Sequence, residues 1–235
     1  METVTAWFAV LDWTAIGQII LIDILLGGDN AVIIALACRN LPARQRRLGV
    51  FWGAAGAIVL RVILISFAVA LLKVPALKLV GGVLLIWIGV KLIAPADGDE
   101  HASVKSSDRL WTAIKTIIVA DFVMSLDNVI AIAGAAEQAD PSQRTGLIIF
   151  GLLVSVPFIV YGSQLVLKLL DRFPLIVSLG GALLGWIAGG LIITDQLLKG
   201  YLPDSQALYL GACSAGALLV VAIAAALKRM RTVKD

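Results

Sequence analysis

The chain has 235 residues, of which 60% are hydrophobic and only 15% are charged, and its mean hydropathy is +0.98. This composition excludes a water-soluble globule, which needs more polar surface, and a net charge of +3 spread over the connections does not indicate nucleic-acid binding. The sequence therefore predicts an all-α polytopic membrane protein, because a segment that crosses about 30 Å of hydrocarbon must satisfy its own backbone hydrogen bonds.

Seven apolar segments are long enough to cross a bilayer as helices. They cover residues 14–37, 49–71, 76–94, 112–136, 145–167, 174–194 and 206–227. The first contains the adjacent pair Gly27-Gly28. A glycine pair beside acidic residues indicates a bend or a broken helix, which membranes tolerate where the freed backbone lines a cavity inside the protein.

A short sequence motif with acidic residues, called here the acidic phrase, occurs twice, and its second copy lies 98 residues after the first. Its polar members are Asp23, Asp29 and Asn30 in the first copy and Asp121, Asp127 and Asn128 in the second. Both copies lie inside apolar segments, where a charged side chain costs roughly 3 kcal/mol at the bilayer centre. Such residues are typical of ion pathways. The alternative is structural: Asp-Asn pairs can link helices by hydrogen bonds, and a protonated buried Asp can be architectural.

The repeat extends beyond this phrase, since Gly53 aligns with Gly151 at the same offset. Each copy would then hold three helices, and an odd number of spans inverts the second copy in the membrane. The predicted organisation is a first three-helix repeat (1–94), a cytoplasmic linker (95–111), an inverted second repeat (112–195), and a peripheral seventh helix with a basic cytoplasmic tail (196–235). Inverted repeats commonly place a binding site at their interface and permit alternating access.

The basic residues indicate the orientation of the chain. Fourteen of the 19 lie in the first, third and fifth connections and in the C-terminal tail, which all fall on one side of the membrane. The positive-inside rule therefore predicts a multi-pass protein of the cytoplasmic membrane with its N-terminus outside and its C-terminus in the cytoplasm.

Oxygen ligands indicate what the acidic phrase would bind. Carboxylates and amides are hard donors that suit Mn²⁺, Ca²⁺ and Mg²⁺ without ranking them. We expect the pairs Asp29-Asn30 and Asp127-Asn128 to form the central site, with Asp23 and Asp121 as further ligands or a second stage of the path. Four carboxylates exceed the charge of one divalent ion, so exchange of the ion for protons is expected.

Several other residues leave two interpretations open. Arg61, inside a span, is either a counter-ion that competes with metal or a structural ion pair or snorkelling arginine. Asp195, at a helix end, belongs either to an exit path or to a solvated terminus. The linker 95–110 could attract a cation, although a solvated linker is favoured. Cys38 and Cys213 are interpreted as small buried hydrophobes.

The phrases Leu26-Gly27-Gly28-Asp29-Asn30 and Ser125-Leu126-Asp127-Asn128, within two three-helix units and one additional span, resemble the TerC family of bacterial membrane proteins. The resemblance covers nearly the whole chain. It implies a bacterial inner-membrane exporter of Mn²⁺, with the four aspartates and two asparagines of the duplicated phrase as metal ligands. The partners expected are the lipid bilayer, a divalent cation and protons. A homo-oligomer is a further expectation, and no prosthetic group is expected.

Two rival functions remain open. One is a scaffold or assembly factor that docks on membrane insertion machinery and would tolerate loss of the acids. The other is an exporter of small organic cations or amino acids, which would need a roomier cavity with an apolar or aromatic lining. An enzyme is not expected, because the sequence contains no paired nucleophile and base, no Cys-x-x-Cys and no nucleotide-binding loop, and so no catalytic residue is assigned.

Overall fold

A computed structural model of the chain describes residues 13–67, 71, 74–95, 106–136, 144–198, 201–203 and 205–232. These residues form eight helices and no strand, which confirms the all-helical prediction. The helices are α2 (Trp13–Leu26), α3 (Gly28–Cys38), α4 (Ala43–Ser66), α6 (Leu77–Ile93), α8 (Ser106–Ala136), α9 (Arg144–Arg172), α10 (Leu175–Ile193) and α11 (Gln206–Thr232).

Four helices in the described part of the chain, α4, α9, α10 and α11, are long and apolar enough to cross a membrane, and the bent pair α2 and α3 would make a fifth span. The 17-residue α6 and the 31-residue α8 cover the other two predicted segments, and the count of seven spans stays a prediction. Both α4 and α8 begin six residues before the corresponding predicted spans, whose first residues are 49 and 112. Hydropathy marks only the part of a helix in hydrocarbon, whereas backbone hydrogen bonding continues into the polar turns beyond it.

The break predicted at the first glycine pair is confirmed. Gly27 separates α2 from α3, with φ −97° and ψ 0°, and the two helices are bent by 48°. A Cβ atom at Gly27 would lie 2.3 Å from the carbonyl oxygen of Asp23, so only glycine fits this bend without a shift. The corresponding stretch of the second copy, around Ser125, is continuous helix within α8.

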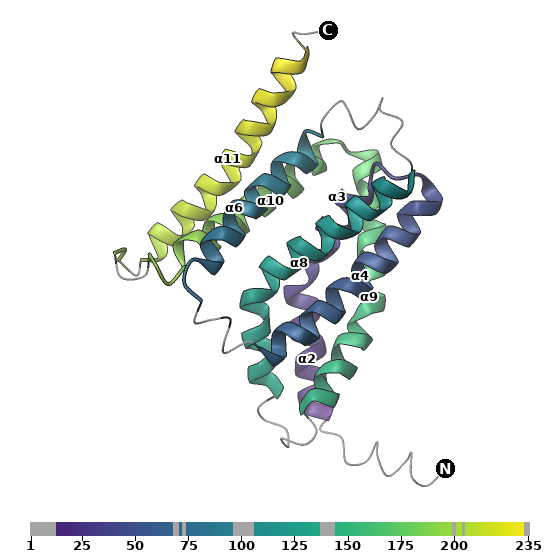
Figure 1. The fold of residues 1–235 in the computed structure, drawn as a ribbon, viewed down its shortest axis with the longest axis vertical. Coiled ribbons are helices and arrows are strands. Elements are labelled where there is room, and N and C mark those ends of the chain that lie inside the picture. Colours follow the sequence, from purple (N-terminus) through teal and green to yellow (C-terminus); the bar gives the residue numbers. More distant parts are fainter. Residues whose placement is uncertain are drawn as a thin grey trace.

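The helices pack as two groups (Figure 1). One contains α6, α10 and α11, and the other contains α2, α3, α4, α8 and α9. The backbones of α10 and α11 approach each other closely: a Cβ atom at Gly189 would be 2.1 Å from the carbonyl oxygen of Ala212, and one at Gly185 would be 2.3 Å from that of Gly216. Small residues four apart allow this approach. The opposite side of α11 stays exposed, for example at Leu218.

Within the second group, the first helix of each predicted repeat packs against the second helix of the other. Gly53 on α4 faces Ile117 on α8, and Gly151 on α9 faces Ile19 on α2. The two isoleucines differ by 98 positions, as do the two glycines. The two contacts therefore involve matching positions of the two copies.

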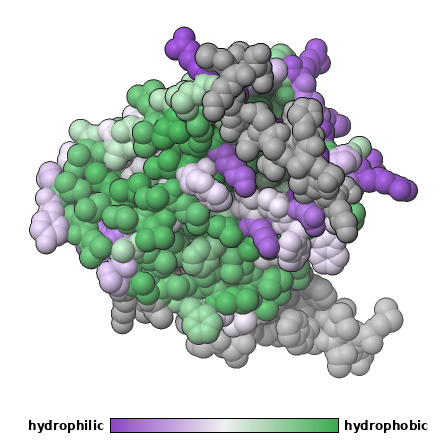
Figure 2. Space-filling view, turned by 45° about the horizontal axis from the view of Figure 1, so that its top comes forward, coloured by the Kyte–Doolittle hydropathy of each residue, from purple (hydrophilic) through white to green (hydrophobic). Residues whose placement is uncertain are grey.

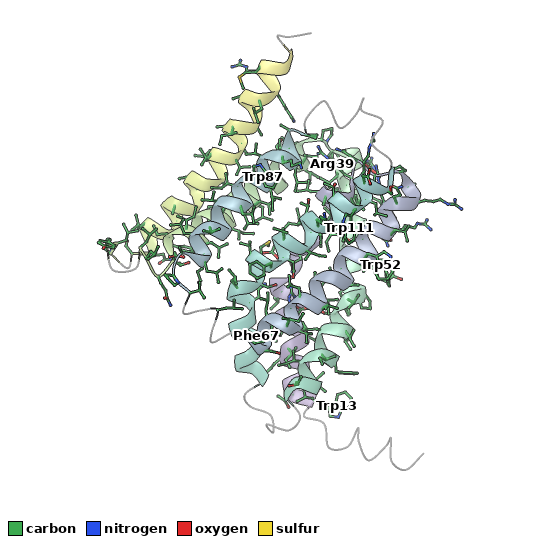
Figure 3. The ribbon with its side chains drawn as sticks, viewed as in Figure 1. Trp13, Arg39, Trp52, Phe67, Trp87 and Trp111 are labelled. Carbon is green, nitrogen blue, oxygen red and sulfur yellow. The ribbon has the colours of Figure 1, made fainter. Side chains whose placement is uncertain are left out.

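The surface has the features of a protein embedded in lipid. A broad hydrophobic face is bordered by hydrophilic residues (Figure 2). The exposed Trp13 and Phe67 lie at one end of the bundle, whereas Trp52, Trp87 and Trp111 lie toward the other (Figure 3). Two belts of exposed aromatic side chains are typical of the two membrane–water interfaces.

Candidate functional site

A buried arginine joins the two copies of the acidic phrase. Arg61 lies within α4, and its side chain is 3% exposed, which excludes snorkelling toward water. Its Nη1 donates to Asp23 of α2, and its Nη2 donates to Asp121 of α8 over 2.7 Å. Asp23 and Asp121 occupy the same position in the two phrases. Residues far apart in the chain are thus held on one guanidinium, whose planar fork suits two carboxylates.

Two buried serines complete this cluster. Ser125 donates its hydroxyl to Asp121 over 3.1 Å and accepts a hydrogen bond from Nε of Arg61 over 3.2 Å. Ser155 of α9 donates to the other acid, Asp23. Ser155 is not among the predicted site residues, because it has no counterpart in the first copy, where Ala57 stands at the equivalent position. With both acids ionised the cluster would carry one excess negative charge, so it has the right sign to attract a cation.

A small cavity of about 10 Å³ adjoins the cluster. Arg61 and Asp121 line it together with Asn30 of α3, and apolar side chains of α3, α4, α8 and α9 form the remainder of its wall. Asn30 is 4% exposed, and neither its amide nitrogen nor its amide oxygen has a hydrogen-bond partner among the described residues. Buried amides are normally paired. The cavity is large enough for about one water-sized occupant, which could satisfy this amide.

The other members of the duplicated phrase lie differently. Asp29 is partly exposed and accepts the backbone N–H of Asn30 over 2.8 Å. Asn128 is buried, and the side chain of Asp127 lies outside the described residues. No three His, Cys, Asp or Glu side chains in the described part of the chain lie close enough together to hold a metal ion. The expected central pairing of Asp29-Asn30 with Asp127-Asn128 therefore stays a prediction, whereas Asp23 and Asp121 are brought together through Arg61.

Asp195 has a clear structural role at the end of α10. It is 1% exposed, so the interpretation as a solvated terminus is wrong. Its carboxylate accepts backbone N–H groups of Ala76 (3.2 Å), Leu79 (3.0 Å) and Leu197 (2.8 Å). Two of these donors belong to the start of α6, where Ala76 has the left-handed φ of 64°. Burial raises the pKa of Asp195, but the backbone amides outweigh burial and lower the pKa below its usual value. The exit-path role stays a prediction.

The two cysteines make no hydrogen bond or ion pair with the Arg61 cluster in the described part of the chain. Cys38 and Cys213 are buried free thiols, in agreement with their interpretation as small hydrophobes. Residues 96–105 of the linker lie outside the described residues.

The chain is similar in sequence to known integral membrane proteins. The model of the family described as "Integral membrane protein TerC family" matches residues 8–232. The uncharacterized membrane protein YjbE of Bacillus subtilis (strain 168) is 43% identical over 178 residues, which cover 76% of this chain and 78% of YjbE. The UPF0053 inner membrane protein YgdQ of Escherichia coli (strain K12) is 26% identical over 209 residues, covering 81% of this chain and 86% of YgdQ. No solved structure matches.

Proposed function

Since the chain belongs to the integral membrane protein TerC family, we propose that it is a transporter that exports a divalent metal cation, Mn²⁺ in the first place, from the cytoplasm. The observation that carries this proposal is the buried cluster of Asp23, Arg61 and Asp121 beside Asn30, whose amide has no partner among the described residues. Charged groups inside a membrane are costly, and their usual purpose is an ion or proton pathway. No catalytic role is proposed for these residues.

The donor atoms suit a hard divalent cation. Two carboxylates and one amide oxygen match the ligand preference of Mn²⁺, Mg²⁺ and Ca²⁺. The choice of Mn²⁺ rests on the family resemblance, because these three ions share ligand chemistry. A cavity of about 10 Å³ favours an atomic ion over an organic cation or an amino acid, which need a much larger site.

Arg61 would act as an internal counter-ion in this transporter. Its guanidinium neutralises one of the two carboxylates when no metal is bound, and a divalent cation would have to displace it to reach Asp23 and Asp121. Metal and arginine would then occupy the acids in turn. This exchange would prevent the empty site from holding two uncompensated buried charges during the return step.

The reciprocal packing of the helices supports an alternating-access mechanism. The contacts of Gly53 with Ile117 and of Gly151 with Ile19 are those expected of two inverted repeats related by a pseudo-twofold axis. Export of a divalent cation against an inside-negative potential of about 100 mV costs about 4.6 kcal/mol before any concentration gradient. Entry of protons could supply this free energy. We place the chain in the bacterial cytoplasmic membrane, because its relative YgdQ is named as an inner membrane protein.

Flux measurements in proteoliposomes test the proposal. Native protein should carry Mn²⁺ at a rate that depends on an imposed pH gradient. Asp121→Asn should lower this flux by at least about tenfold, because it removes a charged ligand from the cluster. Asp171→Asn is the matched control, since Asp171 is an exposed acid paired with Arg46 over 2.8 Å. If native protein carries no divalent cation, or if both variants carry it equally well, the transport function at this site is wrong and a scaffold function becomes the leading candidate.

A further inference from the structure

A second cavity, of about 600 Å³, shares no lining residue with the small cavity beside the acidic cluster. It is formed where α3 and α6 end and where α4 and α8 begin, between the two helix groups of Figure 1. Four basic side chains line it: Arg39, Arg46, Lys91 and Arg109. None of the described lining residues is acidic. This cavity therefore has the opposite charge from the site proposed for the cation.

Within the part of the chain that the structure describes, most of this positive charge has no carboxylate beside it. Arg46 is paired with Asp171, but the described part of the chain offers no ion pair to Arg39, Lys91 or Arg109. The Nε atom of Arg109 is buried and has no hydrogen-bond partner there. Burial lowers the pKa of Arg39, yet an arginine stays charged at neutral pH. A buried N–H donor without an acceptor among the described residues, in a pocket lined by four basic side chains, favours an anionic ligand.

The rest of the wall is apolar and aromatic. Leu36, Ile88 and Leu92 line the cavity. Trp87, which also lines it, is 58% exposed, and the ammonium group of Lys91 lies 5.3 Å from the centre of its ring. Trp87 lies on α6 and Arg39 follows α3, toward the same end of the bundle (Figure 3). Basic and aromatic side chains at helix ends are characteristic of the interface between lipid and water.

We propose that this cavity binds the phosphate headgroup of an anionic phospholipid, with an acyl chain along its apolar wall. A basic pocket between membrane helices matches a phosphodiester in charge, and the apolar lining matches the hydrocarbon attached to it. A free anion such as inorganic phosphate would gain from the arginines but not from the leucines and the isoleucine. The ligand is thus a structural lipid that bridges the two helix groups.

Native mass spectrometry of the full-length protein in detergent tests this assignment. The probes are dioctanoyl phosphatidylglycerol, dioctanoyl phosphatidylcholine and inorganic phosphate. Phosphatidylglycerol should bind, and the double substitution Arg39→Gln with Arg109→Gln should weaken its binding by about thirtyfold, as the usual contribution of two basic side chains at an anionic membrane surface predicts. Zwitterionic phosphatidylcholine should bind much more weakly.

The matched control is Arg44→Gln with Arg47→Gln. It removes the same charge from exposed positions of the same region that do not line the cavity, and it should leave binding within about twofold of native. The assignment is overturned if the control loses as much affinity as the cavity variant. It is also overturned if phosphatidylcholine binds as well as phosphatidylglycerol, or if equimolar inorganic phosphate displaces the lipid.

Discussion

At the scale of single residues, Arg61 and Asp195 are buried charges held by different kinds of partner. Arg61 is held by carboxylates from two helices that are far apart in the sequence. These carboxylates could exchange the arginine for a cation. Asp195 is held by backbone amides that belong to fixed helix ends. The N–H groups at the start of α6 have no partner within the helix and Asp195 satisfies two of them, so its contacts indicate a structural function, whereas those of Arg61 permit exchange.

Asp195 should make the stability of the protein depend on pH. Its folded pKa is lower than the usual value of 3.8, so its contribution is complete above that value and is lost as the pH falls through the folded pKa. Asp195→Asn should lower the thermal midpoint at pH 7 by about 5 °C, because charged hydrogen bonds to the start of α6 are lost. Circular dichroism in detergent measures this. The difference from native should shrink toward pH 3, and an equal difference at both pH values would contradict the assigned role.

At the scale of the helical element, the break between α2 and α3 positions the first acidic phrase. Asp23 precedes the break and Asn30 follows it, and the bend of 48° turns the two parts of the span relative to each other. A continuous helix would direct Asn30 differently with respect to Arg61. In α8, which has no break in the same stretch, Asp121 and Ser125 lie one turn apart and bond to each other.

Gly27→Ala should therefore disturb the site. The new methyl group would lie 2.3 Å from the carbonyl oxygen of Asp23, and relief of this clash requires a change in the bend. We expect Mn²⁺ flux to fall by about tenfold, because loss of a group that orients a metal ligand typically has an effect of this size. Gly28→Ala is the matched control, since its Cβ atom would meet nothing within 4 Å. Equal flux in the two variants would show that the bend does not position the site.

At the scale of the whole molecule, the contacts between equivalent positions of the two copies, Gly53 with Ile117 and Gly151 with Ile19, limit which parts could rock against each other. The first helix of each copy packs on the second helix of the other, so neither copy is a separate body. By contrast, α10 and α11 are locked by close backbone contact at Gly189. Motion in an alternating-access cycle is thus expected between the two helix groups of Figure 1 rather than between α10 and α11.

The orientation of the molecule can be tested with cysteine labelling in intact cells. Ser107 and Ser205 are exposed and lie near the starts of α8 and α11, at opposite ends of the bundle. A membrane-impermeant thiol reagent should label Ser205→Cys from outside and label Ser107→Cys only after permeabilisation, as the positive-inside rule predicts. The native chain supplies the control, because Cys38 and Cys213 are buried. The reverse pattern would invert the proposed direction of transport.

The sequence by itself determined the class of the protein, because hydrophobic composition and span length depend only on local residues and on the thickness of the bilayer. It also determined the break at Gly27, since an adjacent glycine pair weakens a helix locally, and it identified the acids as unusual in an apolar setting. The tertiary structure alone decided that Arg61 pairs with Asp23 and Asp121, that Ser155 joins them, and that Asp195 binds the start of α6. These contacts connect positions far apart in the chain, and helix packing, which no local pattern specifies, brings them together.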